Sequence, residues 1–162
     1  MDKLIKIFRV ISTLVFFVAL LLGYGYLPSK LHLPFVFESR QELYMEKSTL
    51  FYIVLGLFFI ITFSCTLLSY YLKSTAFLAN NNNPDQNSFR RQLKNWINSF
   101  LIVFNIYLLF AIGVVGVINN TENVDISNYA FFAYTGPILL TIWLIILLII
   151  LLRKLSFKKE LT

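Results

Sequence analysis

The chain has 162 residues, of which 58% are hydrophobic and 14% are charged, and its formal net charge is +6. A soluble domain carries about 25% charged residues, so the composition excludes an ordinary soluble fold. The basic residues flank apolar segments and form no separate patch, which argues against nucleic acid as a partner.

Four long apolar segments, separated by short polar loops, dominate the sequence. They lie at about residues 4–27, 49–72, 96–118 and 131–152. Each is long enough to cross roughly 30 Å of hydrocarbon as a helix, which takes about 20 residues. The sequence therefore predicts an all-α, polytopic membrane protein. We expect a bundle of four transmembrane helices that forms one integral membrane domain, residues 1–162, inside the lipid bilayer.

The Lys and Arg residues are distributed unevenly between the two sides of the predicted spans. Of the 14, only Lys30, Arg40 and Lys47 lie in the first and third loops. The other 11 lie at the two chain ends and in the second loop. The positive-inside rule places the side with more Lys and Arg in the cytoplasm, so we predict that both termini are cytoplasmic. We assign five basic residues to topology or to contact with anionic lipid: Arg90, Arg91, Lys94, Arg153 and Lys154.

The residue usage indicates the source of the chain. A bias toward Asn, Lys and Ile is typical of an AT-rich bacterium, which makes the predicted location the inner (cytoplasmic) membrane. Asn119-Asn120-Thr121 is a glycosylation sequon on the outer side. In a bacterium of this kind we expect that the sequon is not glycosylated.

Ionisable residues are absent from the central part of every predicted span. Proton-coupled pumps and transporters place such groups inside the membrane, and intramembrane hydrolysis needs a nucleophile with a base, a carboxylate pair or metal ligands. We therefore predict a non-enzymatic protein with no catalytic residue and no cofactor. On a helix Glu38, Glu42 and Glu46, near His32, could hold a cation such as calcium. We favour a solvated outer face there and predict no metal site.

Three polar side chains lie near the predicted midplane of the membrane. Thr62, Asn105 and Trp143 are each about ten residues from a cytoplasmic end, or roughly 15 Å at 1.5 Å per residue. A buried indole N–H needs an acceptor, and Pro137 leaves the carbonyl of Ala133 without its helical donor. We predict an interhelical polar layer in which Asn105 bonds Thr62, Trp143 or that carbonyl. We favour a structural role over a lipid or quinone-like ligand between the helices.

Small and weakly polar residues that share one helix face are typical of helix–helix contact in membranes. Such faces recur in the second, third and fourth spans. The residues predicted to pack between helices are Asn98, Gly116, Thr66, Pro137 and Thr141.

The first loop, residues 28–48, allows two conformations. Alternating apolar residues from Leu31 predict an extended stretch, whereas Ser39 with Glu42 fits a capping box and a short helix. Ser48 or Thr49 is a natural N-cap for the second span. Both conformations of the loop remain open.

Two short pieces, Tyr26-Leu27-Pro28 and Glu46-Lys47-Ser48-Thr49-Leu50-Phe51-Tyr52, resemble two groups of proteins. One is a family of uncharacterised four-span inner-membrane proteins of Bacteroidota. The other, more distant, is the family around the immunity protein for the sporulation-delaying toxin, which implies toxin immunity or signalling. The loop here lacks that family's His-x-Asn with the following Gly-Pro, so immunity is not our leading prediction.

The leading prediction is an accessory or structural subunit of a larger membrane complex, with other membrane-protein subunits as its partners. The alternative is a toxin-immunity or signal-transducing membrane protein that acts through its outer loop. A second alternative is a small oligomeric channel or carrier.

Overall fold

Four long helices make up most of the structure, a computed structural model that describes residues 2–32, 44–78, 84–119 and 130–159. The helices are α1 (Asp2–Tyr26), α2 (Lys47–Leu78), α3 (Pro84–Ile118) and α4 (Ala130–Lys159). Each contains a segment long and apolar enough to cross a membrane: Lys3–Tyr26, Lys47–Ser74, Ser88–Ile118 and Tyr134–Arg153. The predicted bundle of four transmembrane helices is confirmed, and the chain is a small multi-pass membrane protein.

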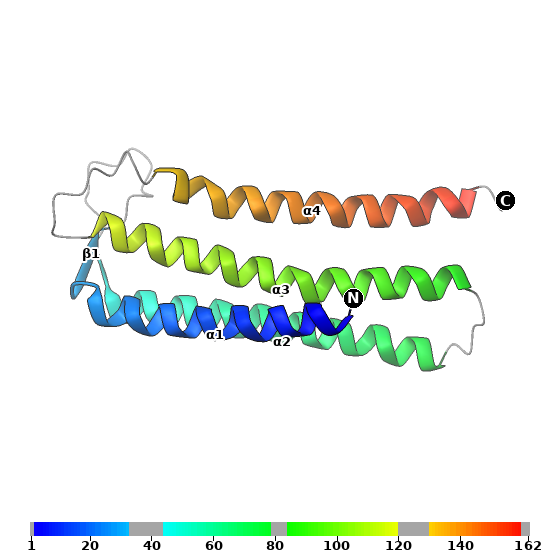
Figure 1. Cartoon of the computed structure of the whole chain (residues 1–162), viewed down its shortest axis with the longest axis horizontal. Coiled ribbons are helices and arrows are strands. Elements are labelled where there is room, and N and C mark those ends of the chain that lie inside the picture. The colour runs from blue at the N-terminus through cyan, green and yellow to red at the C-terminus, as the bar shows by residue number, and fades with distance from the viewer. Residues whose placement is uncertain (1, 33–43, 79–83, 120–129, 160–162) are drawn as a thin grey trace.

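Helix α3 lies at the centre of the arrangement. Figure 1 shows α4 along one side of α3, with α1 and α2 along the other. Successive helices run in opposite directions, so α1 and α3 are parallel. The start of α1, the end of α2, the start of α3 and the end of α4 all lie toward one end of the bundle. We call this the terminal end, and we call the opposite end, where α1 ends and α2 begins, the ribbon end.

The hydrophobic core lies between α1, α2 and α3. The rings of Phe16 and Phe58 stack there with centroids 4.8 Å apart. The buried residues of this core are Phe16, Leu20, Val54, Phe58, Phe104, Leu108 and Ile112. Of the most apolar part of α3, 39% is buried, against 6% for α4. Helix α4 is therefore peripheral and packs along α3 outside this core.

A short antiparallel ribbon connects α1 to α2. It consists of β1 (Lys30–His32) and β2 (Tyr44–Glu46), with Leu31 opposite Met45. Leu31 is fully buried beneath the ribbon, where it packs with Leu27 and Val115. Its burial against two helices fixes which face of the ribbon turns toward the bundle.

The ribbon shows that both ends of the first loop are extended. The middle of the loop, residues 33–43, lies outside the described residues, and with it Ser39 and Glu42 of the predicted capping box. Helix α2 begins at Lys47, just before the predicted caps Ser48 and Thr49. The Ser48 hydroxyl bonds Glu46 instead, at 3.2 Å.

Candidate functional site

Asn105 is the most deeply buried polar side chain of the described residues, with 1% of its surface exposed. Its Nδ2 donates to Ser12 Oγ and to Thr13 Oγ1, both at 3.2 Å. Ser12 Oγ in turn donates to the carbonyl of Arg9 at 3.0 Å. The amide thus joins the middle of α3 to the middle of α1. Its Oδ1 is buried and has no partner among the described residues.

The predicted polar layer of Thr62, Asn105 and Trp143 was wrong in its contacts. Asn105 faces α1, whereas Trp143 lies on α4, on the other side of α3. The carbonyl of Thr62 accepts a bond from Thr66 Oγ1 of its own helix at 2.7 Å. Equal depth in the membrane did not bring the three residues together, because Asn105 faces α1 whereas Thr62 and Trp143 lie on α2 and α4.

A second polar contact joins α3 to α4. Trp96 Nε1 donates to the carbonyl of Trp143 at 2.9 Å. The indole Nε1 of Trp143 itself is buried, with no partner among the described residues. Trp96 begins a row of stacked rings along α3 that continues through Phe100, Phe104 and Tyr107. The sequence predicted a bond to the indole of Trp143, whereas in the structure the backbone carbonyl of Trp143 accepts a bond from Trp96.

The close approach between α3 and α4 is at Gly136. A Cβ atom at this position would lie 2.8 Å from Cδ2 of Tyr107, so only glycine fits without a shift. The predicted packing residues Pro137 and Thr141 are exposed instead, and Thr141 Oγ1 donates to the carbonyl of Pro137 at 2.9 Å. Gly116 has no atom within 4 Å of the corresponding position.

Two of the predicted packing residues, Thr66 and Thr141, bond the carbonyl four residues earlier in their own helices. A threonine hydroxyl bonded in this way is satisfied without a neighbouring helix, which accounts for the exposed position of Thr141. Thr66 Oγ1 also accepts a bond from Arg9 of α1, so Thr66 does contact another helix, as predicted. Weak polarity alone therefore does not decide which residues form the contact face of a helix.

Arg9 lies inside the first span and links three helices. Its Nη1 donates to Asn98 Oδ1 of α3 at 3.1 Å, and its Nη2 donates to Thr66 Oγ1 of α2 at 3.4 Å. Asn98 Nδ2 donates to the carbonyl of Lys94, which holds the amide in place. Arg9 is six residues beyond Lys3, roughly 9 Å deeper along the helix. The sequence alone had indicated only a topology signal at this position.

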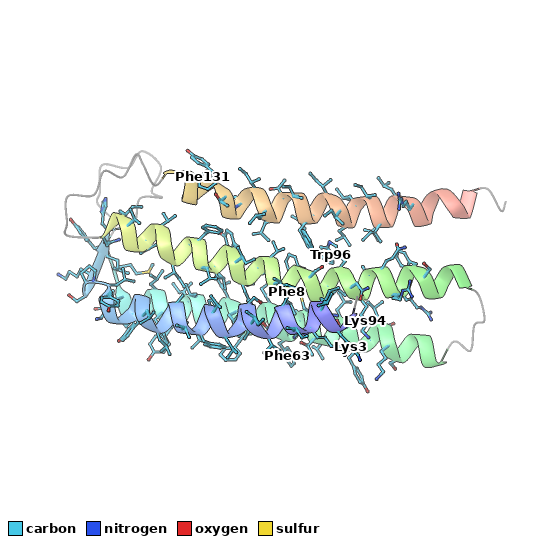
Figure 2. The ribbon with its side chains drawn as sticks, in the orientation of Figure 1. Lys3, Phe8, Phe63, Lys94, Trp96 and Phe131 are labelled. Atoms are coloured by element: carbon cyan, nitrogen blue, oxygen red, sulfur yellow. The ribbon has the colours of Figure 1, made fainter. Side chains whose placement is uncertain are left out.

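The five basic residues assigned to topology or anionic lipid belong to the terminal end. Arg90 and Lys94 are half-buried, and Arg91 and Arg153 are exposed. The side chain of Lys154 lies outside the described residues. Figure 2 shows Lys94 close to the level at which α1 begins.

The opposite end of the bundle is closed by a polar contact between α3 and the ribbon. Asn119 Oδ1 accepts from the backbone N–H of His32, and its Nδ2 donates to the His32 carbonyl at 3.0 Å. The same Nδ2 donates to the carbonyl of Val115 at 2.8 Å. Asn119 thus pairs with β1 much as a neighbouring strand would, and the side chain of the predicted sequon is already engaged.

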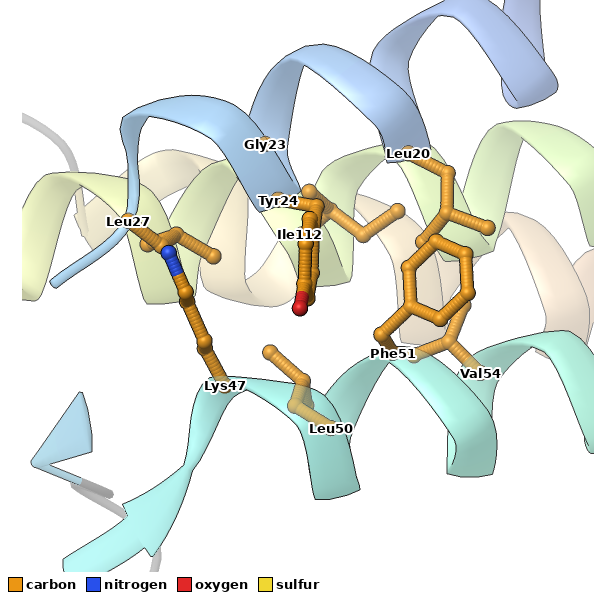
Figure 3. Close-up of a pocket in the computed structure, with 9 residues that line it drawn as sticks. All are labelled: Leu20, Gly23, Tyr24, Leu27, Lys47, Leu50, Phe51, Val54 and Ile112. Atoms are coloured by element: carbon orange, nitrogen blue, oxygen red, sulfur yellow. The ribbon is translucent and has the colours of Figure 1, made fainter. Parts of the chain in front are cut away.

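A small hollow lies beneath this end, between α1, α2 and α3 (Figure 3). The Nζ atom of Lys47 lies 5.0 Å from the ring centroid of Tyr24 at its mouth. Gly23 borders it on α1, where an added Cβ would lie 3.0 Å from Ile112. The hollow has room for about one water molecule, which is too little for a lipid or a quinone.

Residue spacing in α1 contained the signal that the sequence analysis missed. Ser12 and Thr13 are the only Ser and Thr residues of Lys3–Tyr26, and Arg9 precedes them by one turn. Asn98 and Asn105 are seven residues apart, so they share one face of α3. Because α1 and α3 are parallel, these spacings allow two contacts between them: Arg9 with Asn98, and Asn105 with Ser12 and Thr13.

The described residues contain no group of three or more His, Cys, Asp or Glu side chains that could hold a metal ion. Glu38 and Glu42, two of the acids considered above, lie outside them. The polar groups that the structure does bring together join one helix to another. Comparison of the chain with protein-family models, with curated proteins and with solved structures finds no match.

Proposed function

We propose that this small membrane protein is a non-enzymatic accessory subunit of a larger assembly in the inner membrane of a bacterium. The observation that carries the proposal is the packing of α4, which rests on α3 with only 6% of its most apolar segment buried. Large apolar side chains are exposed along its length: Ile138, Ile142, Leu144, Ile145, Leu148, Ile149, Leu151 and Leu152.

Lipid covers such a surface as readily as a protein does, so exposure alone does not decide between them. The packing of α4 adds a second argument. A helix that rests on one neighbour leaves both flanks free for helices of another subunit, while α3 keeps it in place. Bonds such as Trp96 to Trp143 already fix α4 from one side.

The use of the polar side chains also supports a non-enzymatic role. Arg9, Asn105 and Trp96, three prominent polar groups within the spans, each bond a neighbouring helix. Polar groups that bond a neighbouring helix stabilise the bundle, and these three do not line a common cavity. We therefore propose that the protein acts through contacts of its outer surface with other proteins.

The test is mild-detergent purification of a tagged chain at native abundance, followed by native mass measurement and identification of partners. We expect a stoichiometric complex with at least one other membrane protein. Leu148→Trp adds bulk to the exposed face of α4 and should lower recovery of the partner. Leu14→Trp, at an equally exposed position of α1, is the matched control and should not. A lone chain or a symmetric oligomer would contradict the proposal, and the oligomer would favour a channel or carrier.

The proposed orientation, with the terminal end in the cytoplasm, has its own test. Reporter fusions at the two chain ends should be active only as cytoplasmic reporters. A periplasmic reporter that is active at either end would overturn the orientation, since four crossings place both ends on one side.

One observation favours the alternative of toxin immunity or signalling. Asn119 holds the ribbon against α3, so the strands on either side of residues 33–43 form a fixed base at the outer end of the proposed topology. A loop that recognises a secreted peptide would benefit from such a base. Immunity predicts that cells expressing the chain survive a toxin that kills control cells, and that changes at residues 33–43 remove this protection.

A further inference from the structure

The guanidinium of Arg9 lies at the surface of the bundle, where α1, α2 and α3 meet. Arg9 is half-buried, and Thr66, which accepts one of its bonds, is exposed. The bonds to Asn98 and Thr66 use one N–H on Nη1 and one on Nη2. A guanidinium carries five N–H donors in a planar fork, so three remain for a ligand.

The charge of Arg9 has no carboxylate partner among the described side chains. The only acid among them is Glu46, which lies in β2 at the ribbon end. Asn98 and Thr66 are neutral, so they orient the guanidinium without neutralising it. An unpaired cation at membrane depth is costly, and it favours any anion that can reach it.

Other cations lie on the same faces, nearer the terminal end. Lys6 precedes Arg9 by three residues on α1, and Lys94 precedes Asn98 by four on α3, so each shares a helix face with its neighbour. Figure 2 shows Lys3 and Lys94 at a similar level along the bundle. These basic groups favour an anion and disfavour a cation.

Apolar side chains continue from Arg9 toward the middle of the bundle. Val10 of α1 and Phe63 of α2 are exposed, with 59% and 66% of their surfaces accessible. In Figure 2 Phe63 lies further toward the ribbon end than Lys3. A ligand with an anionic head and long hydrocarbon chains would place its head at the basic groups and its chains along these side chains.

We propose that Arg9, held by Asn98 and Thr66, binds the phosphodiester of an anionic phospholipid in the membrane. The planar guanidinium fork suits two phosphate oxygens at once. Lys6 and Lys94 strengthen the field around the headgroup. The site shares only Lys94 with the five basic residues assigned to topology or anionic lipid. It differs from them because its arginine lies within the span and is fixed by two other helices.

The test is native mass spectrometry of the purified full chain, titrated with phosphatidylglycerol or with phosphatidylcholine. Wild type should retain one phosphatidylglycerol molecule more tightly than it retains phosphatidylcholine. Arg9→Gln should weaken phosphatidylglycerol binding roughly tenfold to a hundredfold, the loss expected for one charge-assisted bonding group. Lys30→Gln removes the same charge at the ribbon end and should leave this binding unchanged. Equal retention by wild type and Arg9→Gln would overturn the site.

A second measurement covers the possibility that Arg9→Gln disturbs folding. The unfolding midpoint of wild type should rise with phosphatidylglycerol and not with phosphatidylcholine or inorganic phosphate. Arg9→Lys keeps the charge without the planar fork, so its binding should fall between wild type and Arg9→Gln. Equal stabilisation by inorganic phosphate would show a general anion effect and contradict a lipid site. A bound polypeptide lost only in Arg9→Gln would assign Arg9 to a partner's carboxylate and also contradict it.

Discussion

The side-chain amide of Asn105 donates to the hydroxyl of Ser12 across the contact between α3 and α1, at 3.2 Å. In a membrane the hydrophobic effect does not drive helices together, so close packing and bonds of this kind hold them. A bond between membrane helices contributes about 0.6 kcal/mol on average and up to about 1.7 kcal/mol. Asn105 contacts Thr13 as well, which makes it the principal polar link in the middle of the bundle.

Gly136 and Gly116 should respond in opposite directions to the same substitution. Gly136→Ala places a methyl group against Tyr107 and should cost about 1–3 kcal/mol by overpacking. Gly116→Ala meets no atom within 4 Å and should stabilise its helix by up to about 1 kcal/mol. The free energy of unfolding of each variant can be measured in mixed micelles. Equal effects of the two changes would contradict the close approach of α4 to α3.

The two tryptophans of the contact between α3 and α4 should also differ. Trp96→Phe removes the donor to the carbonyl of Trp143 and should cost about 0.5–1.5 kcal/mol beyond the lost ring area. Trp143→Phe removes a buried N–H that has no partner among the described residues, so its loss should be smaller. The free energies of unfolding of the two variants, measured under the same conditions, give the comparison. A larger loss for Trp143→Phe would mean that its indole has a partner of its own.

Asn119→Ala should release the ribbon from α3. The change removes the bonds to the backbone of His32 and to the carbonyl of Val115, at a cost of about 1–3 kcal/mol. Hydrogen exchange at the amide of His32 should become faster, while exchange in the middle of α3 should not change. Lys30→Ala, an exposed change in the same strand, is the control. Unchanged exchange at His32 in Asn119→Ala would contradict the role of this contact.

The sequence predicted the fold because the signal for each span is long and strong. Four apolar segments of about 20 residues leave few alternatives to four membrane helices. The sequence does not show which helices touch, because outward faces are apolar as well. Leu20 is buried and Leu21 is 62% exposed, although the two are adjacent and identical in type.

The polar contacts were predicted less well than the spans, for a related reason. Depth in the membrane and residue polarity are properties of a single helix, so neither shows which helix lies next to which. Asn105 was identified as important, but its partners depended on α1 lying parallel to α3. The sequence predicts only a topology signal at Arg9, whereas its side chain bonds both α3 and α2.

The most direct test of the view that polar side chains inside the membrane join the helices is a double-mutant cycle. It combines Ser12→Ala and Thr13→Val with Asn105→Leu and measures the free energy of unfolding in mixed micelles. We expect Asn105→Leu to destabilise the bundle and to show a coupling of about 0.5–1.5 kcal/mol with the hydroxyl changes. The opposite result is an Asn105→Leu variant that inserts into the membrane, has the wild-type free energy of unfolding and shows no coupling. That result would contradict the structural role and would favour a ligand at Asn105.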